Sequence, residues 1–139
     1  MREINFRGKR TDNGEWVEGY ITCRPSAIQY EAHYSPWYID KPPSDPDDSG
    51  GFYNVDGSTV GQFTGLIDKR GECKWEGDIF KFGDHLYIIE WNDEEHAFWA
   101  VEPFEPDYSV VLAEFSADEI EVYGNIHDNP ELIAGEGTE

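Results

Sequence analysis

Residues 62 to 82 read QFTGLIDKRGECKWEGDIFKF, and this stretch decides the fold class. Two apolar runs flank a charged turn between Asp68 and Gly71, and a second turn signal follows at Gly77 and Asp78. Glycine adopts positive φ at no steric cost, and an aspartate side chain can bond its own backbone. The pattern therefore predicts short strands joined by tight turns, and it indicates a folding element rather than a catalytic site.

Similar turn signals recur roughly every 8 to 12 residues on both sides of this stretch. Residues 2 to 24 read as a β-hairpin around a turn cluster at 11 to 14, and residues 85 to 101 alternate as a second strand pair. The spacing is typical of a small antiparallel barrel or meander. We therefore predict a mainly β fold, a small antiparallel β-barrel or meander that is SH3-like in the second half, with an N-terminal β-hairpin.

Helical signals are short. Residues Ser116 to Glu119 fit one helical turn with a capping box, and a short helix is expected to begin at Pro130. No long segment follows the 3.6-residue period of an amphipathic helix, and no internal repeat is visible in the sequence.

The length of 139 residues fits a single domain over residues 1–139. Two subdomains are compatible with it, an N-terminal hairpin region at 1–39 and a β-barrel at 53–133. Between them, residues 40–52 are rich in proline and aspartate, which disfavours both strand pairing and a core. We predict a mobile loop there.

The net charge is −20 and is unevenly distributed. All ten basic residues lie between Arg2 and Lys81, whereas residues 82–139 hold sixteen acids and no Lys or Arg. Nucleic-acid phosphates repel such a chain, so no direct nucleic-acid partner is expected. Two interpretations of the acidic half remain open: a solvated surface, or a face that imitates the charge of DNA and attracts a basic partner.

Catalytic signals are weak. The sequence has no phosphate-binding glycine loop, no G-x-S-x-G, no C-x-x-C and no H-E-x-x-H. His85 and His96 flank a predicted strand pair and would hold a metal only if they met across it beside Asp84 or Glu94. Exposed histidines at strand ends are the simpler interpretation. We therefore expect no enzyme activity, no catalytic residues, no cofactor and no metal site.

Four aromatic residues crowd an irregular segment, Tyr30, Tyr34, Trp37 and Tyr38. Tyrosine and tryptophan are favoured both in cores and at the centres of interfaces, so both roles remain open for this segment. These four are the candidate binding residues. No apolar run of about 18 residues and no signal peptide is present, which indicates a cytoplasmic protein without a membrane partner.

Three segments resemble the YopX family of phage and prophage proteins. They are MREINFRGKRTDNGEWVEGYI at 1–21, VGQFTGLIDKRGECKWEGDIFKF at 60–82 and VYGNIHDNPEL at 122–132. The combination T-G-L-x-D-K-x-G followed by E-G-D-I is the most specific part of the resemblance. The middle loop and residues 84–118 match only by position.

The resemblance implies a small protein encoded by a phage or prophage, with a largely β fold, self-association and no established activity. It brings no catalytic residues to this chain. We therefore expect an accessory protein in the cytoplasm of the bacterial host, a homo-oligomer that binds itself and a host or phage protein. The alternative is an acidic DNA mimic that inhibits a host nucleic-acid-binding protein.

Overall fold

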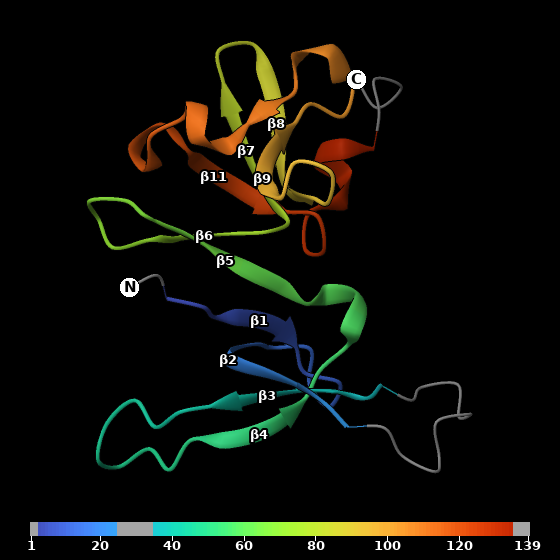
Figure 1. Cartoon of the computed structure of the whole chain (residues 1–139). Helices are drawn as coiled ribbons and strands as arrows, with labels where there is room; N and C mark the ends of the chain where they lie inside the picture. The colour runs from blue at the N-terminus through green and yellow to red at the C-terminus, as the bar shows by residue number, and fades with distance from the viewer. Residues whose placement is uncertain (1–2, 25–34, 135–139) are drawn as a thin grey trace. The chain divides into compact units, whose positions relative to one another are not determined.

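The computed structural model describes residues 3–24 and 35–134. Strands and turns make up this part of the chain, and its only helices are short 3₁₀ segments of three or four residues. The chain divides into two compact units, Met1–Phe63 and Thr64–Glu139 (Figure 1). The mainly β prediction is confirmed. None of the described helices is long or apolar enough to cross a membrane.

The first unit is an antiparallel meander of four strands to which the start of a fifth is added. Its elements are β1 (Phe6–Lys9), β2 (Trp16–Cys23), β3 (Trp37–Lys41), β4 (Gly51–Asn54), the 3₁₀ turn η1 (Gly57–Thr59) and β5 (Gly61–Ile67). After η1 the chain returns so that Gly61 of β5 pairs with Arg7 of β1. The resulting order is β4-β3-β2-β1-β5.

One face of this sheet forms a small core. Val17 of β2, Ile39 of β3 and Val55 after β4 are buried together. Gly19 lies where β2 crosses β3 closely, because a Cβ atom there would collide with the carbonyl of Asp40. The pattern of alternation along EWVEGYITC therefore places its apolar set inward, as the predicted N-terminal hairpin requires.

The second unit contains a separate five-stranded antiparallel sheet. The elements of the second unit after β5 are β6 (Cys73–Trp75), β7 (Asp78–Phe82), β8 (His85–Asn92), β9 (Ala97–Val101), η2 (Pro106–Tyr108), β10 (Val110–Val111), η3 (Leu112–Glu114), η4 (Ala117–Glu119), β11 (Glu121–Asn125) and η5 (Pro130–Ile133). The sheet order is β10-β9-β8-β7-β11. Strand β6 lies beside the later residues of β5, where the Thr64 hydroxyl donates to the Lys74 carbonyl over 2.8 Å.

Both units have the same connectivity. In each, four strands follow one another as a meander, the chain passes through 3₁₀ turns, and a final strand returns beside the first strand of the meander. That order fits the SH3-like expectation for the second half, and it recurs in the first half. The sequence shows no matching repeat, so the likeness lies in the strand order alone.

The sheets are open rather than closed into a barrel, which corrects that part of the sequence prediction. The order of strands leaves β4 at one edge of the first unit and β10 at one edge of the second sheet. Strand β10 has only two residues, too few to continue the ladder around to β11. Short edge strands of this kind also limit unwanted pairing with other chains.

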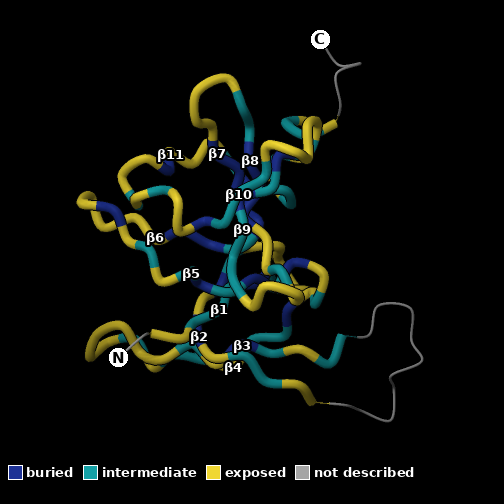
Figure 2. The backbone as a smooth tube through the Cα atoms, turned by 45° about the horizontal axis from the view of Figure 1, so that its top comes forward, coloured by how far each residue is buried: buried dark blue, intermediate teal, exposed yellow. Residues whose placement is uncertain are grey.

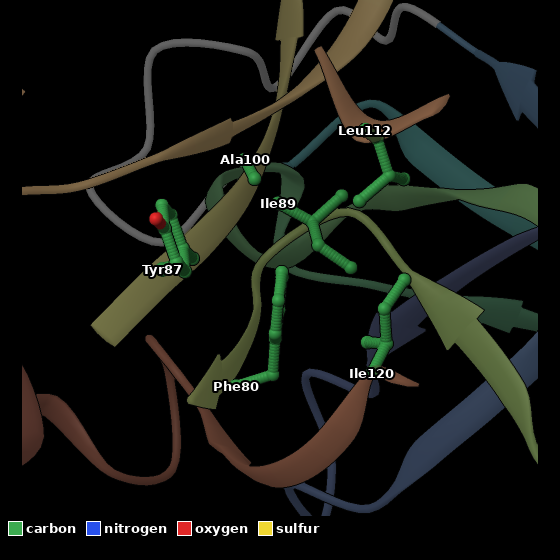
Figure 3. Packing of buried hydrophobic residues seen from close by; sticks show 6 residues of the cluster. All are labelled: Phe80, Tyr87, Ile89, Ala100, Leu112 and Ile120. Carbon is green, nitrogen blue, oxygen red and sulfur yellow. The ribbon is translucent and has the colours of Figure 1, made fainter. Parts of the chain in front are cut away.

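The main cluster of buried side chains in the second unit lies on one face of its sheet. Burial concentrates in the strands and exposure in the turns, as Figure 2 shows. Figure 3 shows the packing of the six buried side chains, which are Phe80, Tyr87, Ile89, Ala100, Leu112 and Ile120. Leu112 and Ile120 come from the turns between β10 and β11. The 3₁₀ segments therefore cover the sheet as well as connecting it.

The 3₁₀ turn before β11 has the predicted capping box. The Ser116 N–H donates to the Glu119 carboxylate over 2.8 Å, and the Ser116 side chain accepts the N–H of Glu119 in return. This reciprocal pair fixes the direction of the chain just before Ile120 enters the core. The short helix predicted at Pro130 is also present as η5.

The turn within residues 62–82 is held by one carboxylate. Asp68 accepts hydrogen bonds from the N–H groups of Arg70 and Glu72 at 2.9 and 3.0 Å, and from the ammonium of Lys74 at 2.9 Å. The Lys74 side chain is only 2% exposed, so its charge requires this partner. Gly71 closes the turn with a φ of 86°. The residues of this turn therefore serve the fold, as predicted.

The proline-rich segment predicted at 40–52 begins within β3 and ends within β4. In the connection between these two strands, the Asp48 carboxylate accepts hydrogen bonds from the ammonium of Lys41, at 2.6 Å, and from the N–H groups of Ser44 and Gly50. The bond from Lys41, together with those from Ser44 and Gly50, holds the pKa of Asp48 well below its usual range. The first unit ends at Phe63, so residues 53–63 belong to it and not to the second unit.

Replacing Phe80 tests the core of the second unit. Phe80 is fully buried, whereas Phe82 lies two residues away on the same strand and is largely exposed. We expect Phe80→Ala to lower the free energy of unfolding by about 3–5 kcal/mol, and Phe82→Ala to lower it by less than half as much. Urea denaturation of both variants measures the difference, and equal losses would contradict the packing described here.

The Asp68 carboxylate gives a pH-dependent prediction. The bond from Lys74, with those from the Glu72 and Arg70 N–H groups, lowers the pKa of Asp68 to about 2. A pKa below that of the unfolded chain stabilises the fold at higher pH, and this contribution is lost as the pH falls toward 2.

We therefore expect Asp68→Asn to be less stable than the parent chain above about pH 4, with the difference shrinking at lower pH. Urea unfolding at a series of pH values measures it. Asp84→Asn, at an exposed turn, is the control and should show little change at any pH. A deficit for Asp68→Asn that stays constant down to pH 2 would contradict the carboxylate's role.

Candidate functional site

Aromatic side chains gather on the face of the first sheet opposite its core. The register pairs Tyr20 with Asp40 and Asp40 with Phe52, so Tyr20 and Phe52 project from the same face. Tyr38 also belongs to this face, since it pairs with Thr22 on β2. We call Tyr20, Tyr38 and Phe52, together with Arg24, the aromatic face.

The members of the aromatic face are in contact with each other. The rings of Tyr38 and Phe52 stack with centroids 5.3 Å apart. The guanidinium of Arg24 lies 4.5 Å from the Phe52 ring centre and 5.9 Å from that of Tyr38. Tyr20 and Phe52 nevertheless remain 61% and 42% exposed. Single exposed rings are common on protein surfaces, whereas rings that adjoin one another on a sheet form a candidate contact surface.

The same face continues onto β1, where two cationic side chains lie beside the ring of Trp16 on β2. Arg7 lies 4.5 Å and Lys9 lies 5.5 Å from the ring centre of Trp16. These attractions keep cationic side chains extended over aromatic rings. The face therefore offers aromatic rings beside basic side chains, and the acids Glu18 and Asp40 lie on it too.

A cleft of about 630 Å³ adjoins this region within the first unit. Its lining includes Trp16, Tyr20, Lys41, Pro42, Pro43 and Tyr53. Tyr20 belongs both to the cleft and to the aromatic face.

The four predicted binding residues separate into two groups. Tyr30 and Tyr34 lie outside the described residues. Trp37 and Tyr38 are successive residues of β3, so their side chains project from opposite faces of the sheet. Trp37 packs over η1, where a Cβ on Gly57 would come within 2.5 Å of its ring. Of the two described candidates, only Tyr38 belongs to the aromatic face.

A second cluster joins a histidine and two carboxylates in the second unit. His85 Nδ1 lies 3.0 Å from Glu102 Oε2 and 3.7 Å from Glu105 Oε1. The ring of Tyr108 stacks on that of His85 with centroids 4.2 Å apart. His85 begins β8, whereas Glu102 follows β9 and Glu105 precedes η2. Within the described ranges, these three residues form the one group of donors able to hold a metal ion.

Hydrogen bonds fix the buried carboxylate of this cluster. Burial by itself raises the pKa of Glu102, but the bonds from His85 and from the N–H groups of Phe104 and Glu105 outweigh it, and the pKa lies below its usual value. Oε1 accepts both N–H groups, at 2.8 and 3.2 Å. Oε2 is thereby directed toward the imidazole.

The hypothesis that His85 and His96 meet across the strand pair is wrong. His85 pairs with Phe82 at one end of β8, whereas His96 lies in the turn at the other end, after Asn92. The carboxylates beside His85 are not the predicted Asp84 and Glu94. The strand register is the feature that identifies Glu102 as the partner of His85. Ile88 pairs with Val101, and this pairing places Glu102 diagonally across from His85 on the same face of the sheet.

Comparison with known protein families matches residues 5–134 to the YopX family, described as YopX protein. This match covers nearly the whole chain and agrees with the resemblance found from the three sequence segments. A search of curated proteins found no match.

The contact between Arg24 and Phe52 can be measured. We expect Arg24→Gln to lower the free energy of unfolding by about 0.5–1 kcal/mol, because it removes the cation from the ring. A double-mutant cycle with Phe52→Leu isolates this attraction from the other contacts of Arg24. Arg70→Gln with Phe52→Leu serves as the control cycle, since Arg70 is far along the chain and pairs with Glu72. A coupling energy of zero for the first cycle would contradict the geometry.

Proposed function

Because the chain belongs to the YopX family, we propose that it is a phage- or prophage-encoded accessory protein that acts by binding protein and by self-association, and not by catalysis. The aromatic face is its contact surface. The observation that carries this proposal is the exposure of Tyr20 and Phe52 on a regular sheet, with Arg24 lying over the Phe52 ring.

The composition of the face supports binding to protein. Tyrosine and arginine are enriched among residues that dominate binding energy, and such residues cluster around pockets. The cleft beside Tyr20 provides a pocket. The sheet supplies a rigid backbone, so little conformational entropy is lost when a partner binds.

A second copy of the chain fits this face. The face presents both a cation, at Arg24, and exposed aromatic rings, at Tyr20 and Phe52. Two such faces related by a two-fold axis are complementary, since the cation of each meets the rings of the other. Burial of the apolar rings provides the rest of the driving force.

Two substitutions on the face test self-association. We expect the parent chain to sediment as an oligomer, and the variant carrying Tyr20→Ser and Phe52→Ser to dissociate with a Kd at least tenfold higher, since loss of hot-spot rings costs about 2 kcal/mol or more. Sedimentation velocity over a range of protein concentrations gives both constants.

Tyr123→Ser is the matched control, because Tyr123 is 54% exposed on β11 of the second unit. It should leave the Kd unchanged. A monomeric parent chain, or an equal effect of the control, would contradict self-association through this face. Capture of host and phage proteins by the parent chain but not by the double variant would extend the surface to other partners.

The charge of the second unit favours one other function. Residues 64–139 contain twenty acids and four Lys or Arg, a net charge of −16. Such a surface can imitate DNA and occupy a host nucleic-acid-binding protein. Binding of that kind weakens steeply with salt, whereas contact through the aromatic face persists, so the salt dependence of a captured partner separates the two functions.

A further inference from the structure

The three donors around His85 are spaced like the ligands of one metal ion. Zn²⁺ binds imidazole nitrogen and carboxylate oxygen at about 2.0–2.2 Å, which places neighbouring ligands about 3.0–3.4 Å apart at the angles of octahedral and tetrahedral sites. His85 Nδ1 lies 3.0 and 3.7 Å from the oxygens of Glu102 and Glu105. All three donor atoms lie within 4.8 Å of one another, and exposed Glu105 can close the remaining distance by a change of rotamer.

The charge of the cluster favours a divalent cation. Two carboxylates converge on one imidazole, so even a protonated His85 neutralises only one of them. A divalent ion bound by neutral imidazole and both carboxylates leaves no net charge. Glu102 is buried, where an unbalanced charge is most costly, so the gain from neutralisation is greatest at that residue.

The surroundings already hold the ligands in position. Two N–H groups fix Oε1 of Glu102, and its own N–H donates to the Ser109 hydroxyl over 2.9 Å. Tyr108 stacks on the imidazole and restricts its rotation. Outer contacts of this type orient metal ligands in known sites and account for much of their affinity.

We propose that His85, Glu102 and Glu105 form a binding site for Zn²⁺, with water completing the coordination. A mixed set of one nitrogen and two oxygens accepts several divalent ions, and Zn²⁺ binds such a set more tightly than Mn²⁺ or Fe²⁺. Since Glu105 lies in the connection between β9 and β10, the ion would fasten that connection to the start of β8. This site is independent of the aromatic face and of the proposed self-association.

Zinc titration of the purified chain tests the site. Calorimetry with Zn²⁺ in excess Mg²⁺ suppresses non-specific binding to the acidic surface, because Mg²⁺ prefers all-oxygen sites. We expect one Zn²⁺ per chain, with a Kd that rises at least tenfold in Glu105→Gln and in His85→Gln. At the same Zn²⁺ concentration, bound Zn²⁺ should also raise the midpoint of thermal unfolding more for the parent chain than for Glu105→Gln.

The controls are chosen from residues of the same types. Glu114→Gln, an exposed acid outside the cluster, and His96→Gln, at the opposite end of β8, should leave the Kd unchanged. Glu105→Gln changes an exposed side chain, so the variant should fold, and its circular dichroism spectrum verifies this. No binding by the parent chain in excess Mg²⁺, or equal weakening by the control variants, would overturn the proposal.

A structural readout comes from nuclear magnetic resonance of the imidazoles. Zn²⁺ should shift the ring signals of His85 and leave those of His96 in place. A shift of both to the same extent would mean adventitious binding to any exposed histidine and would also overturn the site.

Discussion

The antiparallel register of each sheet is the constraint on which the other features depend. Once Ile39 of β3 projects into the first core, its neighbours Tyr38 and Asp40 must project from the opposite face. A shift by one residue would bury Tyr38 and expose Ile39. The burial of a small core therefore determines which aromatic rings remain exposed.

The same reasoning applies to the second unit. Phe80, Tyr87 and Ala100 lie on the core face, and the period of two carries that face onward to His85 at the start of β8 and to Glu102 just after the end of β9, at the same end of the sheet. The cluster therefore begins where the hydrophobic core ends. Polar residues can occupy these positions because strand ends are reached by solvent, and backbone N–H groups of the following turn are available to a carboxylate.

Local features of the fold could be predicted from the sequence, whereas distant pairings could not. The turn at Gly71, the capping box at Ser116 and the N-terminal hairpin each depend on residues a few positions apart. The return of β5 beside β1 and of β11 beside β7 depends on residues tens of positions apart, and no turn residue specifies it. For this reason the shared connectivity of the two units, and their open edges, were visible only in the structure.

Of the residues that make up the aromatic face, the sequence singled out only Tyr38. Composition shows an excess of aromatic rings, but it does not show the face of the sheet from which each ring projects.

Two carboxylates in the second unit show how a structural ion pair differs from the proposed metal site. Asp68 and Glu102 are both buried, and each accepts two backbone N–H groups and one side-chain nitrogen. The nitrogen partner of Asp68 is the ammonium of Lys74, which neutralises the charge and offers no lone pair to a metal. The partner of Glu102 is an imidazole, which has a lone pair when neutral, and a second carboxylate stands beside it at Glu105. The charges of the first arrangement balance without a ligand, whereas the two carboxylates of the second would gain from a cation, which is the condition that the proposed metal site requires.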